Sequence, residues 1–388
     1  MLQQLKFSPK LLRSCDVMNN TERTEPVIAT YLHEKGGRLG LPVSGTFELT
    51  SRCNFSCPMC YVHDQMKDSD NLSSELSAEQ WINIAQSACD SGMMFALLTG
   101  GEPLLRRDFF EIYSAMKSMG LMISVNTNGS LLKGETLRKL IENPPFRVNI
   151  SLYGGCAETY RNMCGNNAFA DVTGAILSLK DAGVDVRLNL SLTPMNKDDM
   201  QIIYEFANEN GIHIKFNTYM YPPHRIKDTD TASHSRFTPD EAARYSSQWD
   251  YLRLGEEEYK KRCERILANT FLSDDECMVD MDKGVRCRAG RSSFWITWDG
   301  KLLPCGMMTS PAVSLNLLSF TEAWAYIKAE SENLYLPEHC VTCSKRKICN
   351  VCPAVCVSET GSFKGIPEYL CQYTDELISF AKDYMDKQ

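Results

Sequence analysis

Short apolar runs alternate with longer amphipathic stretches from residue 45 to about residue 217. Runs of this length that are rich in β-branched and aromatic residues predict strands. We expect strands at residues 45–50, 95–99, 121–126, 147–152, 185–192 and 213–217. Because helical stretches separate these runs, the pattern predicts an α/β fold with a parallel sheet.

Glycines mark the expected ends of the helices. Gly92, Gly120, Gly183 and Gly211 each precede an apolar run, as a glycine C-cap does. The interval from Gly120 to Gly183 is about twice as long as the others, and Pro144-Pro145 supplies the missing break within it. Six β-α units are therefore expected between residues 45 and 217.

The flanking segments are less regular. Residues 1–44 are too few to form a sizeable core, so we expect them to pack on the following domain as a strand or a helix. Residues 218–276 predict a helical linker, with a helix that begins after Thr238 as N-cap and has Pro239 at its first position. Residues 277–388 form a cysteine-rich third region.

Composition narrows the class of protein. The chain has 388 residues, of which 43% are hydrophobic, as expected for a globular protein of two or three domains. A net charge of -8 argues against a nucleic-acid surface. The sequence shows no apolar core of a signal peptide and no run of membrane-spanning length. Seventeen cysteines without a secretion signal indicate a reducing compartment, so we expect a soluble cytoplasmic protein without a membrane or nucleic-acid partner.

Three cysteines follow the first predicted strand directly, in the sequence Cys53-Asn-Phe-Ser-Cys57-Pro-Met-Cys60. Thiolates this close together suit zinc or an iron–sulfur cluster. Structural zinc normally takes four ligands, and His63 is the only nearby candidate for a fourth. A [4Fe–4S] cluster held by three cysteines keeps one iron open to a small molecule, and we favour this interpretation.

A second motif, Gly100-Gly101-Glu102-Pro103, follows the second predicted strand. The two glycines permit close approach of the backbone to a ligand, and Glu102 can pair with an ammonium group. Together with the cysteine triplet, this motif resembles the radical S-adenosylmethionine (SAM) enzymes. The resemblance implies a partial (β/α)6 TIM-like barrel, with SAM bound at the open iron and its amino group held by Gly100, Gly101 and Glu102.

The resemblance implies further SAM contacts. Ser151 closes the fourth strand in a stretch whose serine often contacts the SAM ribose in the family. Tyr153 stands where that stretch usually has aspartate, so only the serine carries over. Met59 takes the place of the family's usual aromatic residue, and its thioether can pack against adenine.

Polar residues at the ends of other strands are weaker candidates. Chemistry in such barrels lies at the C-terminal ends of the strands. Asn126 and Asn128 follow the third strand, and Asn189 lies in the fifth. Arg161 is a candidate for the SAM carboxylate. For each of these residues a turn or a polar surface position is an equal alternative.

The cysteine-rich region resembles the SPASM extension of radical SAM enzymes, which carries two auxiliary [4Fe–4S] clusters. The resemblance assigns the outer cluster to Cys340, Cys343, Cys349 and Cys371. It assigns the inner cluster to Cys287, Cys305 and either Cys352 or Cys356, with Cys277 as a possible fourth ligand. A zinc ribbon is the alternative, but ribbon pairs are typically separated by ~15–20 residues, whereas Cys343 and Cys349 have five between them.

A radical SAM/SPASM enzyme would cleave SAM reductively to a 5′-deoxyadenosyl radical and remove a hydrogen atom from its substrate. An auxiliary cluster could then accept an electron or bind a substrate thiolate. The resemblance favours an oxidoreductase that modifies a peptide or protein, through a cross-link, a thioether or an epimerisation, as in the maturation of ribosomally made peptides. It also implies an electron donor such as flavodoxin or ferredoxin. Residues 1–44 are too few for a leader-peptide-binding domain, so a separate protein is expected to serve that role.

Other functions stay open. Relatives that dehydrogenate or epimerise a small sugar or cyclitol are one alternative, and oxidation of the sulfatase-maturing kind is another. The second is disfavoured because Gly306 follows Cys305 where those relatives have aspartate. Cys156 and Cys164 are candidate hydrogen donors, although a buried inert thiol is the simpler role for each. An alternative of a different class is a non-catalytic zinc or iron–sulfur module.

Overall fold

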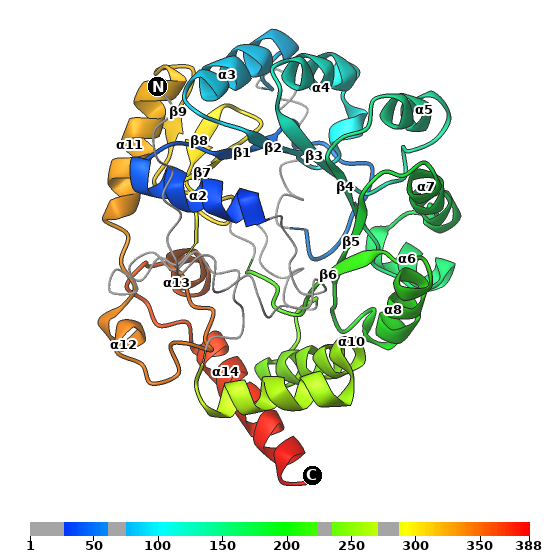
Figure 1. The fold of residues 1–388 in the computed structure, drawn as a ribbon, viewed down its shortest axis with the longest axis vertical. Coiled ribbons are helices and arrows are strands. Elements are labelled where there is room, and N and C mark those ends of the chain that lie inside the picture. Colours follow the sequence, from blue (N-terminus) through cyan, green and yellow to red (C-terminus); the bar gives the residue numbers. More distant parts are fainter. Residues whose placement is uncertain (1–26, 61–74, 223–234, 271–286) are drawn as a thin grey trace, which may run out of the picture.

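The computed structural model describes residues 27–60, 75–222, 235–270 and 287–388, and its centre is a curved sheet (Figure 1). Six parallel strands follow one another in the sheet in chain order. They are β1 Ser44–Glu48, β2 Phe95–Thr99, β3 Met122–Thr127, β4 Arg147–Ser151, β5 Val186–Ser191 and β6 His213–Asn217. The predicted α/β fold with a parallel sheet is confirmed. Since β6 is an edge strand of the sheet, the barrel is not closed.

Three later strands extend the sheet beyond β1. They are β7 Ser293–Ile296, β8 Lys301–Leu303 and β9 Val313–Ser314. The first pairs with β1 in parallel, with Thr46 opposite Trp295, and the other two continue as antiparallel neighbours. Their short lengths explain why the hydrophobic pattern did not predict them. The cysteine-rich region thus contributes three strands to the same sheet as the barrel. The predicted domain bounds stay a prediction.

Helices cover the outer face of the sheet (Figure 1). Those between the parallel strands are α3 Ala78–Asp90, α4 Phe109–Ser118, α5 Gly134–Glu142, α6 Ala157–Cys164, α7 Phe169–Asp181 and α8 Met200–Glu209, with 3-10 turns η3 Pro103–Leu105 and η4 Lys197–Asp199. The remaining helices are α2 Val27–Leu39, α10 Pro239–Leu267, α11 Phe320–Glu332, α12 Glu338–Val341, α13 Pro353–Thr360 and α14 Glu368–Met385. None of the helices in the described ranges is long and apolar enough to cross a membrane.

The local signals for helix ends agree with the structure. All four glycines predicted to end helices have positive φ, from 59° at Gly211 to 111° at Gly92. The helix α5 ends at Glu142, before Pro144-Pro145. Thr238 is the N-cap of α10 and forms a capping box with Glu241. Residues 143–146, between α5 and β4, hold the break expected in the longest interval.

The strands alternate between two environments. In β5, Val186, Leu188 and Leu190 are buried against the outer helices, whereas Arg187 and Asn189 face the inside of the barrel. The outer layer contains the largest fully buried side chains, Trp81, Tyr113, Tyr160, Phe47, Phe109 and Phe294. The apolar core therefore lies between sheet and helices, and the inside of the barrel combines polar side chains with apolar ones such as Phe95 and Met122.

Helix α2 packs at the N-terminal ends of the strands. His33 stacks on Phe95, the first residue of β2, with ring centroids 5.8 Å apart. Its Nδ1 atom also lies 3.2 Å from the Ser292 hydroxyl, just before β7. Ala29 and His33 line the central cavity. This helix therefore covers the end of the barrel opposite to the loops that carry the cysteine and glycine motifs.

A matched pair of glycine substitutions tests the packing of the sheet. A Cβ at Gly45 in β1 would overlap the Phe294 ring, whereas a Cβ at Gly174 in α7 would meet nothing within 4 Å. We expect Gly45→Ala to destabilise the protein by about 1–3 kcal/mol. Gly174→Ala should stabilise it by about 0.5–1 kcal/mol, because alanine favours a helix interior. Denaturant unfolding of both variants provides the measurement, and equal midpoints would contradict the packing described.

Candidate active site and cysteine clusters

The glycine motif is bonded to the backbone of the cysteine loop. Gly101 N donates to Thr50 O at 2.8 Å, and Glu102 N donates to Arg52 O at 2.7 Å. A Cβ at Gly100 would overlap Thr50 O, and one at Gly101 would overlap Arg52 O. The sequence predicts glycines that admit a ligand; the structure adds that both are needed for contact with the loop that carries Cys53.

Glu102 is fully buried and joins the ends of two strands. Its carboxylate accepts hydrogen bonds from Leu104 N at 3.0 Å, Asn128 N at 2.7 Å and the Thr127 hydroxyl at 2.9 Å. Burial raises the pKa of this carboxyl to about 7, although these hydrogen bonds oppose the shift. A cation beside Glu102 would favour the carboxylate form, so the group is suited to an ammonium ligand.

Asn128 orients the cysteine loop from the neighbouring strand end. Its Nδ2 donates to Asn54 Oδ1 at 2.9 Å and lies 3.7 Å from Cys53 Sγ, while Phe55 N donates to the same sulfur at 3.4 Å. Only 8% of Asn128 is exposed, so it is not a surface residue. Two N–H groups directed at one sulfur are typical of the surroundings of a metal-bound thiolate.

The thiols of Cys53, Cys57 and Cys60 lie close enough to influence one another electrostatically. Burial raises the pKa of Cys53 to about 12. A hydrogen bond with the Cys164 thiol, together with burial, raises the pKa of Cys57. Both groups would therefore be thiolates at neutral pH only when bound to a cation, which fits iron ligands. His63 lies outside the described residues.

Four cysteines of the C-terminal region surround a cavity of about 100 Å³: Cys340, Cys343, Cys349 and Cys371. This is the set that the resemblance assigns to the outer cluster. Within the described ranges, no three His, Cys, Asp or Glu side chains converge as the ligands of a single metal ion would. The donor set and the cavity fit a sulfur-ligated cluster.

A second cavity of about 290 Å³ is lined by Cys287, Cys305 and Cys352, with Tyr221 at its wall. Cys356 does not line it. The Cys356 side chain is fully buried in an apolar cluster. The structure therefore groups Cys352, and not Cys356, with the two cysteines expected to hold the inner cluster. Cys277 lies outside the described part of the chain.

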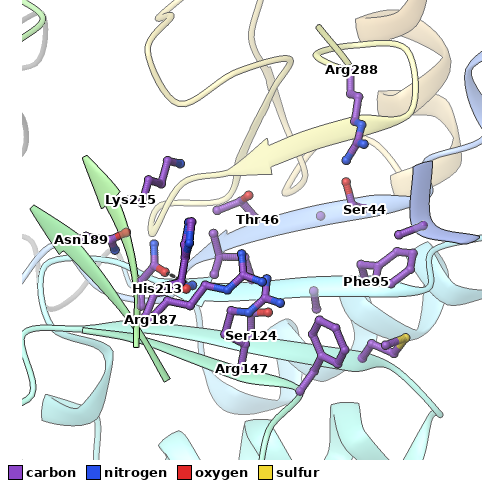
Figure 2. Close-up of a pocket in the computed structure, with 18 of the residues that line it drawn as sticks. Ser44, Thr46, Phe95, Ser124, Arg147, Arg187, Asn189, His213, Lys215 and Arg288 are labelled. Carbon is purple, nitrogen blue, oxygen red and sulfur yellow. Dashed lines mark hydrogen bonds between the residues drawn. The ribbon is translucent and has the colours of Figure 1, made fainter. Parts of the chain in front are cut away.

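The barrel encloses a cavity of about 630 Å³, which opens between the strands shown in Figure 2. Asn126 and Asn189 line it, as does Tyr153. Asn126 accepts a hydrogen bond of 2.8 Å from Asn149 of the next strand. Ser151 is the register partner of Asn189, at the C-terminal end of the same face. Asn126, Asn189 and Tyr153 therefore lie at the cavity instead of in surface turns, whereas Ser151 does not line it. Contact of Ser151 and Asn189 with SAM stays a prediction.

Four other candidates do not line the cavity. Arg161 and Cys156 are exposed on α6 and at its N-cap, and neither lines the cavity. Cys164 is fully buried beside Cys57. Met59 is partly buried and packs against the main core. For Cys156, Arg161 and Cys164, the rotation of α6 about its axis decides the position, and the sequence leaves that rotation uncertain.

Several residues of the cavity were not predicted from the sequence. Arg147, Arg187, His213 and Lys215 line it from β4, β5 and β6. Within any one strand the sequence gives little indication of these residues, because each is an ordinary polar residue in a run that alternates between apolar and polar positions. It becomes visible when three successive strands are aligned by register, because the basic residues then fall on the same face.

A polar pair joins β1 and β7 outside the lining of the cavity. Trp295 Nε1 donates to Glu48 Oε2 at 2.9 Å. The backbone of Gly306 packs against this indole, and a Cβ at residue 306 would be 2.7 Å from the ring. A side chain at residue 306 would therefore displace Trp295, which agrees with the absence of aspartate after Cys305.

Comparison with known proteins gives the family. Residues 47–207 match the Radical SAM superfamily. A probable GTP 3′,8-cyclase of Methanothermobacter thermautotrophicus is 31% identical over 282 residues, which are 69% of this chain and 86% of that protein. This chain belongs to the radical SAM superfamily. The family predicted from the cysteine and glycine motifs is thereby confirmed, and it implies SAM and a [4Fe–4S] cluster as cofactors.

Two further proteins match a larger share of this chain. The AdoMet-dependent heme synthase of Methanosarcina barkeri is 26% identical over 335 residues, or 82% of this chain and 93% of that protein. Streptococcus suis SuiB, bound to its precursor peptide SuiA, has a similar fold, with a TM-score of 0.66 at 18% identity. The match covers 94% of this chain and 86% of SuiB. The predicted partial barrel with a C-terminal domain is the fold of that neighbour.

A pair of cysteine substitutions tests the inner group. We expect Cys352→Ala to lower the iron content of the anaerobically reconstituted protein by about four atoms, since one [4Fe–4S] cluster is lost. Cys356→Ala should keep the full content, because its thiol lies in the apolar cluster. Iron and sulfide analysis gives the answer, and the reverse pattern would show that Cys356 is the ligand.

Proposed function

We propose that this protein is a radical SAM oxidoreductase with three [4Fe–4S] clusters, which removes a hydrogen atom from a peptide or protein. Cys53, Cys57 and Cys60 would hold the cluster that binds SAM. The observation that carries the proposal is the backbone contact between this cysteine loop and the Gly100–Glu102 motif, beside a polar cavity large enough for a substrate.

The residues of this chain would bind and orient the reactants. When bound, SAM and its cluster supply a 5′-deoxyadenosyl radical that can attack an unactivated carbon. Glu102 would hold the SAM amino group, and Asn128 would keep Cys53 in place. Ser151 and Asn189 are register partners on β4 and β5 and would contact the ribose. Arg161 as a partner of the SAM carboxylate is the least supported contact, because its side chain is exposed on α6.

The inner cysteine group adjoins the barrel cavity along the chain. Cys287 lines the inner cysteine group, and the next residue, Arg288, lines the barrel cavity. Gly306, next to Cys305, lies against the ring of Trp295, whose register partner Thr46 lines the cavity. A cluster held by Cys287, Cys305 and Cys352 would therefore lie near a substrate in the cavity, where it could accept an electron.

A peptide substrate is supported by the SPASM-like cysteine pattern and by the similarity of fold to SuiB, whose structure includes a precursor peptide. Such an enzyme would need an electron donor, such as flavodoxin or ferredoxin, and a separate protein to bind a leader peptide. Cross-linking, thioether formation and epimerisation are all consistent with this arrangement.

A small anionic molecule is the second candidate substrate. Relatives called heme synthase and GTP 3′,8-cyclase align with most of this chain. The basic residues of the cavity also favour it. Oxidation of the sulfatase-maturing kind has less support, because the Trp295 ring takes the space that an acidic side chain at residue 306 would need.

Iron analysis tests the proposal. The reconstituted wild-type protein should contain about twelve iron atoms, and Cys53→Ala/Cys57→Ala/Cys60→Ala about eight, since each cuboidal cluster holds four. The triple variant should form no 5′-deoxyadenosine. Cys164→Ala is the matched control, since it removes a thiol that lies beside Cys57 but is outside the motif, and it should keep about twelve.

The alternatives predict different results. A fall from about eight to about four irons would leave one auxiliary cluster and favour the small-molecule substrate. Zinc without iron in the wild-type protein would exclude radical chemistry and favour the non-catalytic module.

The pH dependence of SAM binding tests Glu102. Only the carboxylate form can pair with an ammonium, and burial raises its pKa to about 7. SAM affinity should therefore increase up to about tenfold between about pH 6 and about pH 7.5, below the range where an α-amino group loses its proton. Glu102→Gln should bind SAM more weakly and show no such increase. An equal pH slope in both proteins, measured by anaerobic calorimetry, would remove Glu102 from this role.

A further inference from the structure

We infer that Glu75 and Arg106 position the start of the cysteine loop and thereby determine how firmly the loop holds its cluster. Both are positioning residues, since neither belongs to the cysteine motif or to the glycine motif. This inference deepens the proposed function and rests on it, because the loop would hold the cluster that binds SAM.

Glu75 binds the part of the chain that leads into the cysteine motif. Its two carboxylate oxygens accept hydrogen bonds from Nε and Nη2 of Arg52, both at 3.1 Å, and one of them also accepts from the Thr50 hydroxyl. Thr50 and Arg52 come just before Cys53, whereas Glu75 follows Cys60 in the sequence. Two parallel hydrogen bonds between an arginine and a carboxylate fix orientation as well as distance. The pair therefore fixes the direction in which the chain enters the motif.

Arg106, which follows η3, supports the same stretch from the other side of the glycine motif. Its Nη1 donates to Leu49 O at 2.8 Å, and its Nη2 donates to Leu76 O at 3.0 Å. The Asp108 carboxylate accepts from Nε and Nη2 at 2.9 and 2.7 Å and holds the guanidinium in this orientation. Nη1 also lies 3.7 Å from a carboxylate oxygen of Glu75. One guanidinium thus joins the chain just after β1 to the residue that follows Glu75.

Thr50 and Arg52 are held from two sides. Gly101 N and Glu102 N donate to their main-chain carbonyl groups, whereas Glu75 accepts from their side chains. None of these contacts involves a thiol. The start of the loop therefore depends on Glu75 whether or not the cysteines bind iron.

Burial makes these contacts hard to replace. The side chain of Glu75 is 8% exposed and that of Arg106 is 5% exposed, and Thr50 is fully buried. A buried polar group that loses its partner keeps the cost of its removal from water. Substitution of Glu75 would leave the Thr50 hydroxyl without this acceptor and would let Arg52, which is 36% exposed, turn to solvent. The stretch before Cys53 would then open locally more often.

Competition between an iron chelator and iodoacetamide tests the inference in the anaerobically reconstituted protein. A thiol that loses its iron is alkylated, and peptide mass spectrometry follows each cysteine separately. We expect Glu75→Gln to increase the alkylation rate of Cys53 about tenfold or more, while Cys340 and Cys349 react as in the wild type. Arg106→Gln should also increase the Cys53 rate, because two buried carbonyl groups lose their donor.

A double variant shows whether Glu75 acts through Arg52. If it does, Arg52→Gln increases the alkylation rate of Cys53 in the wild-type background and has little further effect in Glu75→Gln, because the interaction is already absent. Effects that multiply would overturn the role of this pair. Arg52→Gln alone decides the inference if Glu75→Gln does not fold, and a wild-type Cys53 rate in that variant would overturn it.

Glu359→Gln, on α13, is the matched control. The Glu359 carboxylate also accepts two hydrogen bonds from one arginine, Arg236, and one from a hydroxyl, that of Tyr219, and its side chain is 10% exposed. In this variant Cys53 should react as in the wild type. A wild-type Cys53 rate in Glu75→Gln, or an equal increase in the control, would overturn the inference. Formation of 5′-deoxyadenosine by the wild type is measured separately. Its absence would reject the proposed function, whereas the alkylation rates would still decide the inference.

Discussion

The two backbone hydrogen bonds between the cysteine loop and the glycine motif are the constraint on which the site depends. They join the end of β1 to the end of β2, and the absence of a Cβ at Gly100 and at Gly101 permits the close approach of the two backbones. A cluster ligand and a group suited to an ammonium are thereby held at a fixed separation by main-chain geometry. Side-chain rotamers contribute little to this separation, which makes the site insensitive to their motion.

The third strand completes the arrangement. Thr127 and Asn128 both bond to the Glu102 carboxylate, and the Asn128 side chain reaches back to Cys53. Three consecutive strand ends therefore form one hydrogen-bonded unit. The buried carboxylate belongs to that unit, so its charge and the position of the cysteine loop depend on the same contacts.

Much of this fold could be predicted from the sequence. The strands at 95–99 and 213–217 have the predicted bounds, and the other four lie within about two residues of theirs. Thr238 begins its helix as predicted. These features depend on local chemistry: alternation of apolar residues, glycine after a helix and a capping threonine before one.

Features that depend on distant parts of the chain could not be predicted in this way. The spacing of the cysteines left Cys352 and Cys356 equivalent, and only the three-dimensional packing separates them. The basic residues of β4, β5 and β6 look like ordinary polar positions until the register brings them to one face. The exposure of Arg161 depends on the rotation of a short helix about its axis, which no single motif fixes.

The pairing of β1 with β7 determines when the sheet can be completed during synthesis of the chain. Glu48 and Trp295, which bond across these strands, are 247 residues apart. At ~5–20 residues per second, translation leaves one edge of β1 without its partner for roughly 10 to 50 seconds. An unpaired strand edge is a template for pairing with another chain. The nascent protein therefore exposes an edge at the centre of its future sheet to pairing with other chains during that interval.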